Sequence, residues 1–420
     1  MPEEQACRGS RRQGAGRAPG LGFRSNCTRR TLTPDLPALA AFLSEHRGLW
    51  EPRPFVEGAP PWVGERPALA AWLRGLSPDE VDAFEERPEE HPDAPAELVE
   101  LAAQARRFEL PPPPATGSDL PRSVKVPAAK VAQIEGLLDR LGPPHHQRAV
   151  DWCAGKGHLA RSPATRTGAP VRAVERDPAL CAAGEALAAR QGLEVRFRAA
   201  DVLEEDLGDW IGGGSLLALH ACGPLGMEAL RLARERKAGS VALAPCCYHK
   251  VAHPWLPLSA RAGGLLLSPS SLRLATSEEV VASPRLRRAR RERMLLRLSV
   301  DELMRAATGR DVYHPMRSWP EAWSREGLAS LCRHLHQERG LPLSQDPARQ
   351  DEARRAAEPR VHEGRALGLI RAPFRRPLEL WLVADRAAWL DEAGMRVEVL
   401  AFCERRLSPR NLLLRAAWPG

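Results

Sequence analysis

Apolar residues recur three or four positions apart in several short stretches between residues 33 and 110. Residues with this spacing share one face of a helix, so the stretches predict short amphipathic helices. The predicted helices cover residues 36–43, 67–76 and 94–108. Thr33 and Ser77, each followed closely by Pro and Asp, stand where helix N-caps are expected. We therefore predict a helical accessory domain at 31–110, followed by a proline-rich linker at 111–127.

The pattern changes at residue 128. A helix is predicted at 128–141, and short apolar runs then alternate with helical segments. The runs predicted to be strands are 149–153, 171–175, 195–199, 215–220 and 240–244, with helices at 178–190 and 226–236 among them. Strands separated by helices are typical of a parallel sheet covered on both faces. The sequence therefore predicts an α/β core of Rossmann-like type at 128–253.

The last part of the chain is predicted to complete this core. Residues 254–370 hold an arginine cluster and several prolines without a regular apolar pattern, so we predict an insertion there. A helix is predicted at 377–392. Strands predicted at 396–402 and 411–416 are close enough along the chain to form a hairpin. Residues 371–420 should therefore return to the sheet.

Composition limits the class of protein. A chain of 420 residues with 43% hydrophobic residues can bury one large core or two modest ones. No apolar run approaches the roughly 20 residues that cross a bilayer. The arginine-rich residues 1–30 lack the apolar centre of a secretory signal, and we predict a disordered basic tail there. The nine cysteines include no C-x-x-C pair, which disfavours a disulfide scaffold and favours the cytoplasm.

The net charge of +8 is unevenly distributed. Residues 1–30 carry about +5 and residues 31–120 about −10, which leaves about +13 for residues 121–420. Such a basic region suits an anionic partner such as RNA. An arginine-rich genome composition would give the same charge, so charge alone does not identify the partner.

The strongest local feature is the stretch Asp-Trp-Cys-Ala-Gly-Lys-Gly-His-Leu at 151–159, which follows a predicted strand and opens a helix. Glycines let the backbone approach a ligand closely, and a helix N-terminus offers N–H groups to an anion. Glu175 ends the second predicted strand, 24 residues after Asp151, where an acid can accept both hydroxyls of a ribose. Asp201 follows the third strand, where it could accept from an adenine amino group.

Each of these acids alone could equally cap the helix that follows it. Three acids at successive strand ends, however, would all face one crevice at the carboxyl edge of the sheet. An NAD-dependent Rossmann enzyme has a similar turn and ribose acid. The second acid, Asp201, favours S-adenosylmethionine.

Four stretches resemble one protein family. The stretch at 151–159 resembles the cofactor motif D-x-G-x-G-x-G-H-L of the methyltransferase-like protein 25 family. The other similar stretches are Leu-His-Ala-Cys-Gly at 219–223, Pro-Cys-Cys-Tyr-His at 245–249 and Leu-Ser-Pro-Arg-Asn-Leu at 407–412. Related H-x-C-G and C-C-H-H patterns occur in tRNA acceptor-stem ribose 2′-O-methyltransferases, which are more distantly similar. The resemblance covers residues 120–260 and 375–417.

The resemblance implies a class I methyltransferase fold, with an open seven-stranded sheet whose last strand is antiparallel. S-adenosylmethionine would lie over strands one to four, with the glycine turn around its methionine part, Glu175 at the ribose and Asp201 at the adenine. His220 would lie beside the exit of the methyl group. The implied cofactor-binding residues are Asp151, Cys153, Ala154, Gly155, Lys156, Gly157, Glu175, Asp201, Val202 and His220.

Two features depart from these families. Cys153 stands where the family has its first glycine, and its side chain should narrow the floor of the pocket. Cofactor binding is compatible with a cysteine there if its φ stays negative. The N-terminal zinc-binding Cys/His set of the tRNA enzymes is missing from this sequence.

The candidate catalytic residues are His220, Tyr248 and His249, because they follow strands four and five, where the methyl acceptor should enter. They would orient or deprotonate a poor nucleophile such as a ribose hydroxyl. The candidate substrate-binding residues are Cys246, Cys247, Tyr248, Arg410 and Asn411. The cysteines and histidines at these strand ends lack the short paired spacing of structural zinc sites, so we predict no metal and expect packed cysteines near the substrate.

Six arginines lie within residues 285–294. On an exposed helix they would suit phosphate contacts, and a solvated charged face is the alternative. The sequence as a whole predicts a cytoplasmic S-adenosylmethionine-dependent methyltransferase with RNA as the favoured acceptor. A protein or small-molecule methyltransferase is the second hypothesis. A catalytically silent scaffold that binds the cofactor or RNA is the third, and Cys153 keeps it open.

Overall fold

The computed structural model describes residues 33–57, 59–113, 127–141, 148–251, 254–277 and 283–419. The predicted basic tail at 1–30 and most of the predicted linker at 111–127 lie outside the described residues. Among the helices that are described, none combines the length and the apolar character needed to cross a bilayer.

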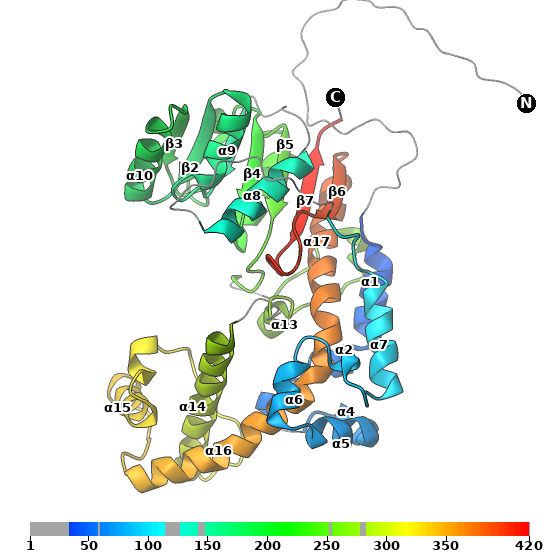
Figure 1. Ribbon diagram of the computed structural model, residues 1–420, viewed down its shortest axis with the longest axis vertical. Coiled ribbons are helices and arrows are strands. Elements are labelled where there is room, and N and C mark those ends of the chain that lie inside the picture. Colours follow the sequence, from blue (N-terminus) through cyan, green and yellow to red (C-terminus); the bar gives the residue numbers. More distant parts are fainter. Residues whose placement is uncertain are drawn as a thin grey trace, which may run out of the picture.

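A seven-stranded sheet forms one end of the molecule (Figure 1). Its strands are β1 (Ala149–Trp152), β2 (Val171–Glu175), β3 (Val195–Ala199), β4 (Ser215–Leu219), β5 (Ser240–Ala244), β6 (Arg396–Ala401) and β7 (Leu412–Ala417). They lie in the order β3-β2-β1-β4-β5-β7-β6. Strands β1 to β5 pair in parallel, and β7 runs antiparallel to both of its neighbours. The predicted Rossmann-like methyltransferase fold, with an antiparallel last strand, is confirmed.

Helices cover both faces of this sheet. They are α8 (Ala128–Leu141), α9 (His158–Thr167), α10 (Pro178–Ala189), α11 (Gly208–Ile211), α12 (Pro224–Arg234) and α17 (Arg375–Asp391). Neighbouring residues of one strand point to opposite faces. Leu216 of β4 accordingly packs in the apolar cluster that includes α12 and α17, whereas Leu217 packs in the cluster that includes α8 and α9. Continuous apolar runs are therefore needed in the central strands.

The other end of the molecule is a helical layer (Figure 1). Its N-terminal helices are α1 (Leu36–Glu45), α2 (Arg47–Trp50), α3 (Pro54–Glu57), α4 (Trp62–Glu65), α5 (Pro67–Gly75), α6 (Pro78–Ala83), η1 (Pro88–Glu90) and α7 (Ala96–Arg106). Its later helices are η2 (Ala260–Ala262), α13 (Pro269–Leu274), α14 (Pro284–Thr308), η3 (Glu321–Ser324), α15 (Leu328–Arg339), α16 (Pro347–Gly368) and η4 (Leu369–Phe374). Helix α16 contacts α3, α5 and α6 as well as α14, so the two groups pack together.

The structure supports one predicted helix cap and corrects the other. Ser77 caps α6 in a reciprocal arrangement, in which its hydroxyl accepts from the Glu80 amide and the Glu80 carboxylate accepts from the Ser77 amide. Thr33 is not the cap of α1. Asp35 takes that place, and its Oδ1 accepts from the Ala38 amide at 3.1 Å. A carboxylate directly before the helix is the stronger cap, and Pro37 fits the first turn behind it.

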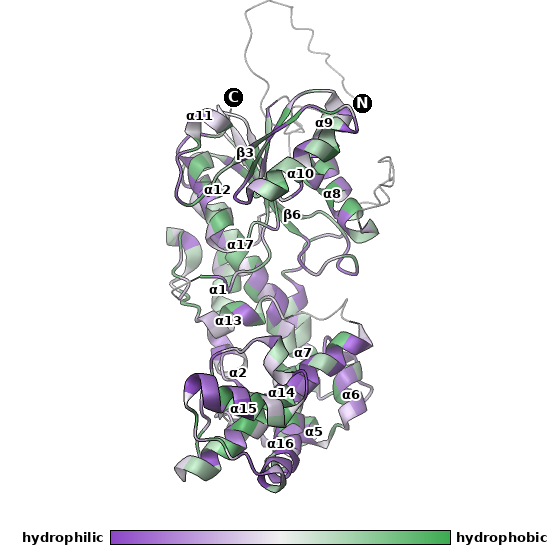
Figure 2. Ribbon diagram, turned by 90° about the vertical axis from the view of Figure 1, so that its left-hand side faces the viewer, coloured by the Kyte–Doolittle hydropathy of each residue, from purple (hydrophilic) through white to green (hydrophobic). Residues whose placement is uncertain are grey.

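The predicted insertion at 254–370, which has no regular apolar pattern in the sequence, contains the two long helices α14 and α16. Their arginine- and glutamate-rich sequences bury only narrow apolar stripes, and Pro359 interrupts the pattern within α16. Figure 2 shows the hydrophilic character of these helices beside the more hydrophobic sheet. Helical propensity and pairing between helices outweigh the weak apolar period here.

Candidate functional site

The turn between β1 and α9 contains three residues in the left-handed region. They are Cys153 with φ of 59°, Gly155 with 55° and Gly157 with 64°. Cys153 therefore does not keep the negative φ that we expected to make a cysteine compatible with the turn. A left-handed conformation costs a residue with a Cβ about 1–2 kcal/mol. The backbone at 153 has a conformation that suits glycine, and the cysteine there has the energetic cost of a left-handed φ.

Packing explains why the last glycine of the turn is needed. A Cβ added at Gly157 would lie 2.6 Å from Cζ of Phe197, which comes from β3. The same ring atom would lie 2.3 Å from a Cβ at Gly184 of α10. At Gly155, in contrast, no atom lies within 4 Å of the Cβ position. The open space beside Gly155 is what a turn that admits a ligand requires.

Asp151 lies beneath this turn, with 3% of its surface exposed. Its Oδ2 accepts from the Ala160 amide in the first turn of α9 at 2.9 Å. Burial raises its pKa to about 7, although the Ala160 amide and the charge of Lys130 act in the opposite direction. The carboxylate therefore fixes the start of α9 relative to β1, which holds the glycine turn in place.

Glu175 and Asp201 lie at the carboxyl ends of the two neighbouring strands. Glu175 Oε2 accepts from the Gly155 amide at 2.8 Å, so it ties the turn to β2. Asp201 Oδ1 accepts from the Leu203 amide at 3.0 Å, and its other oxygen lies 3.6 Å from the Arg176 guanidinium. Both side chains are half-buried, and Val202 beside Asp201 is buried.

The Cys153 thiol lies among these acids. Burial, followed by the negative charges of Glu175, Asp151 and Asp201, raises the pKa of Cys153 to about 12. The thiol is therefore neutral at physiological pH and does not act as a nucleophile there. The three acids that the sequence singled out therefore lie near the side chain at 153, at the carboxyl edge of the sheet where the sequence predicts the cofactor crevice. The other turn residues provide backbone atoms: the Ala154 amide donates to Val174, and Lys156 is exposed.

His220 follows β4 across the point where the strand order reverses, because β1 and β4 are neighbours in the sheet. It also has a left-handed φ, of 66°. Its Nε2 lies 2.7 Å from Oε1 of Gln133 on α8. Burial, assisted by the charge of Lys130, lowers the pKa of His220 to about 4, so the ring is neutral at pH 7. Gln133 was missed in the sequence, where it is one of several polar side chains of the predicted helix and nothing sets it apart.

Tyr248 lies in a buried polar network rather than at an open surface. Only 1% of it is exposed, and its hydroxyl donates to Glu379 Oε1 of α17 at 3.5 Å. Glu379 in turn pairs with Arg376 at 2.6 Å and with Arg410 at 3.2 Å. Burial, and then the Glu379 charge, raises the pKa of Tyr248 well above its usual value. This environment makes Tyr248 a structural link between the loop after β5 and α17.

Arg410 and Asn411, predicted to bind substrate, belong to the same network. Asn411 Oδ1 accepts from Arg376 at 2.8 Å, and its amide nitrogen donates to the Cys403 carbonyl at 2.7 Å. Arg410 donates to the Ala275 carbonyl at 2.6 Å. Both residues are buried within this network and do not face an open surface as substrate-binding residues would. The sequence offered no sign of Glu379 and Arg376 as their partners, because these residues lie more than 30 positions earlier.

His249, Cys246 and Cys247 remain near the open side. His249 is half-buried, and its Nδ1 lies 3.4 Å from the Thr276 hydroxyl. Burial lowers the pKa of His249. The Cys246 sulfur lies 2.7 Å from that of Cys222, which follows β4. Hydrogen bonding from Cys246 is the largest cause that lowers the pKa of Cys222 to about 6.

Comparison with known proteins agrees with this arrangement. Residues 128–254, which include β1 to β5 and the crevice, match the model of a family described as a methyltransferase domain. One similar solved structure is a geranyl diphosphate methyltransferase in complex with GPP and sinefungin, with 19% identity and a TM-score of 0.23. That match covers 42% of this chain and 65% of the other, so this chain spans just under two thirds of that protein.

A second similar solved structure is a coclaurine N-methyltransferase bound to N-methylheliamine and SAH, with 15% identity, a TM-score of 0.27 and coverage of 81% of this chain and 96% of that one. The family match gives this chain a class I methyltransferase domain, whose cofactor is S-adenosylmethionine. The enzyme class and the cofactor predicted from the sequence are confirmed.

Proposed function

We propose that this protein methylates RNA, and that it is a member of the methyltransferase-like protein 25 family. The observation that carries the RNA proposal is the arginine-rich start of α14. Arg285, Arg288 and Arg293 lie in its first three turns and are exposed. None of the described acidic side chains forms an ion pair with these three arginines. Guanidinium groups in this state are well suited to phosphate oxygens.

A described residue shortly before this helix in the chain contacts His249 at the carboxyl edge of the sheet. Thr276, which contacts His249, lies eight residues before Pro284, where α14 begins. Figure 1 shows α13 and the start of α14 between the sheet and the lower helices. An RNA strand that contacts these arginines would therefore pass the side of the molecule on which the strands β4 and β5 end. Phosphate contacts of this kind position a nucleic acid without reading its sequence.

A cavity of about 240 Å³ adds to the basic surface. It lies between α14 and α16, and seven arginines line it together with one glutamate. The arginines are Arg53, Arg287, Arg290, Arg291, Arg365, Arg371 and Arg375. Some of them pair with acids of α6, for example Arg365 with Asp82 at 2.5 Å. The excess of guanidinium groups supports binding of an anion at this place.

Residues of the crevice are proposed to hold the cofactor as the resemblance implies. Glu175 has lone pairs beyond those used by the Gly155 amide and can accept from the ribose hydroxyls. Asp201 can accept from the adenine amino group, and the backbone of the glycine turn approaches the methionine part. The cofactor supplies a methyl group bonded to a sulfonium sulfur. The protein then has to align the acceptor oxygen or nitrogen with that carbon.

Proton removal by the protein is expected to be weak. His220, with a pKa near 4, is neutral but a poor base at pH 7. Tyr248 is buried against Glu379 and cannot reach an acceptor without leaving its network. We infer that positioning of the acceptor contributes more than general-base catalysis, and that His220 and His249 orient it.

The experiment uses the full chain with tritiated S-adenosylmethionine and total RNA and protein from cells that lack this protein. Label should appear in RNA. The variant R285E/R288E/R293E should lower RNA labelling at least tenfold. It should leave the dissociation constant of S-adenosylmethionine unchanged. The matched control R333E/R355E reverses exposed arginines of α15 and α16 and should behave as the wild type.

Three other results would count against RNA as the acceptor. Label in the protein fraction would favour a protein methyltransferase, and label in neither fraction with intact turnover of S-adenosylmethionine would favour a small-molecule acceptor. Cofactor binding without turnover of any kind would favour the catalytically silent scaffold. Equal RNA labelling by both arginine variants would remove α14 as the binding surface.

A further inference from the structure

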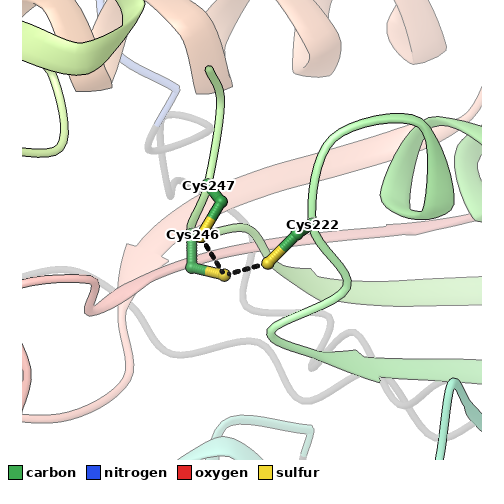
Figure 3. Close-up of side chains that lie close together, drawn as sticks. All are labelled: Cys222, Cys246 and Cys247. Carbon is green, nitrogen blue, oxygen red and sulfur yellow. Dashed lines mark hydrogen bonds between the residues drawn. The ribbon is translucent and has the colours of Figure 1, made fainter. Parts of the chain in front are cut away.

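Three cysteine thiols converge where β4 and β5 end (Figure 3). Leu219 of β4 and Ala244 of β5 are partners in the parallel ladder, and Cys222 and Cys246 lie three and two residues beyond them. Cys247 follows directly. The Cys246 sulfur lies 2.7 Å from the Cys222 sulfur and 3.7 Å from the Cys247 sulfur. All three sulfurs lie within 4.8 Å of one another.

These thiols have no other partner that explains their convergence. Cys222 and Cys246 contact the His220 carbonyl, at 3.2 Å and 3.7 Å, and within the described part of the chain the other hydrogen bonds of the three sulfurs are among themselves. Each of the three cysteines is half-buried. A disulfide would use two of the thiols and would not explain why the third lies beside them. Three convergent sulfurs are a ligand set for a soft metal ion.

We propose that Cys222, Cys246 and Cys247 bind one zinc ion as thiolates and leave its fourth coordination position open to water or to the methyl acceptor. Among the described residues, no further histidine, cysteine or carboxylate lies close enough to complete the set. Three protein ligands with one open position are the arrangement of a catalytic zinc site, whereas structural sites are closed by four. The inference does not depend on the acceptor being RNA.

The distances fit a zinc ion after a small adjustment. With a Zn–S bond of about 2.3 Å and tetrahedral angles, sulfur ligands lie roughly 3.8 Å apart. Cys246 and Cys247 are already at this separation. Cys222 would have to move away from Cys246 by about 1 Å, which a change of its side-chain torsion provides.

This arrangement shows why spacing along the chain argued against a metal. Zinc ligands are commonly recognised as spaced pairs on one loop. Here one ligand comes from the loop after β4 and an adjacent pair from the loop after β5. The parallel neighbours β4 and β5 bring the two loops together, which no local spacing rule detects.

The test is the metal content of the full-length protein, purified under reducing conditions. We expect about one zinc per chain by plasma mass spectrometry. The single variants C222S, C246S and C247S should each lower it at least tenfold. Cobalt added to the metal-free protein should give tetrahedral d–d bands and a thiolate-to-cobalt charge-transfer band, whose intensity falls by about a third in each variant that still binds cobalt.

The variant C332A is the matched control, because Cys332 is a buried cysteine of α15 outside the cluster. It should keep the zinc and the full cobalt spectrum. Circular dichroism of each variant shows whether a loss of metal reflects unfolding. Absence of zinc from the folded wild type together with no charge-transfer band would overturn the proposal. A Cys222–Cys246 disulfide found by peptide mapping, with no metal bound after its reduction, would replace it with a redox pair.

Discussion

The α/β end and the helical end of the molecule are built in different ways. In the sheet, β1, β2 and β4 are each followed closely by a helix, and the three acids lie at the ends of β1, β2 and β3, which follow one another in the chain and are neighbours in the sheet. In the helical layer, α16 packs on α3, α5 and α6, which lie hundreds of residues earlier. The structure of the α/β end therefore depends on local sequence. The structure of the helical end, which we propose contacts the acceptor, depends on contacts between distant segments.

The first prediction concerns a substitution that destabilises the helical end and leaves the α/β end unchanged. Asp301 of α14 is fully buried and pairs with Arg305 and Arg360, at 3.1 Å and 2.8 Å. D301A removes the buried carboxylate, although Arg305 keeps its pair with Asp311 and Arg360 keeps its pair with Glu302, and it should lower the free energy of unfolding by about 3 kcal/mol. Urea denaturation measures this loss. The dissociation constant of S-adenosylmethionine should stay within about twofold. A large loss of cofactor affinity would show that the two ends are not separable.

The second prediction concerns a substitution that destabilises the α/β end. G157A introduces a Cβ that meets the Phe197 ring at 2.6 Å and a residue that disfavours the left-handed φ. The two effects together should cost about 3 kcal/mol. The matched variant G155A has the same kind of φ but open space, so it should cost only about 1 kcal/mol. Thermal unfolding compares the two. Equal losses would mean that Phe197 moves freely and does not fix the turn.

The third prediction concerns the pH dependence of the cofactor end. Because burial raises the pKa of Asp151 from an unfolded value near 4 to about 7, its protonated form is the favoured one in the folded state. Its contribution to stability is present below pH 4 and is lost as the pH rises to 7 and above. D151N should remove this decline and be more stable than the wild type by about 2 kcal/mol at pH 8. Unfolding curves between pH 5 and 8 should show that the difference in free energy of unfolding between D151N and the wild type widens with pH. A difference that stays constant would contradict the prediction.

The smallest effect is expected at the strained cysteine. C153G removes a Cβ from a left-handed residue and a thiol from the floor of the crevice. It should stabilise the protein by about 1 kcal/mol. It should also tighten the binding of S-adenosylmethionine, which calorimetry measures. Unchanged affinity would show that the thiol does not reach the cofactor and that the departure from the family is neutral for binding.

The sequence predicted the cofactor end well because its signals are local. Strands β2, β3 and β5 have the predicted bounds. Each is a short stretch rich in apolar residues, with charged residues at some positions of β2 and β3. The positions of Glu175 and Asp201 at strand ends followed from the same runs. The left-handed φ of Cys153 could not be foreseen, because it is imposed by the β1–α9 connection and not by the residue itself.

The parts that were not foreseen depend on residues far apart in the chain. The burial of Tyr248, Arg410 and Asn411 follows from Glu379 and Arg376 on α17, and a sequence pattern does not show which distant charges will meet. The cluster of Cys222, Cys246 and Cys247 likewise exists only once β4 and β5 are neighbours. Long-range pairing, and not a lack of chemical signal, limited the prediction of the site.

Helix α17 joins the two ends and has a mechanical consequence. It contacts α1 and η4 in the helical layer and β6 and β7 in the sheet, so one rigid rod is embedded in both bodies. Asp385 of α17 also accepts hydrogen bonds from the amides of Leu258 and Ser259. These bonds hold the segment after β5 against α17. A hinge that swings the two bodies apart would have to bend this helix. The relative position of the two ends is therefore coupled to the straightness of a single helix.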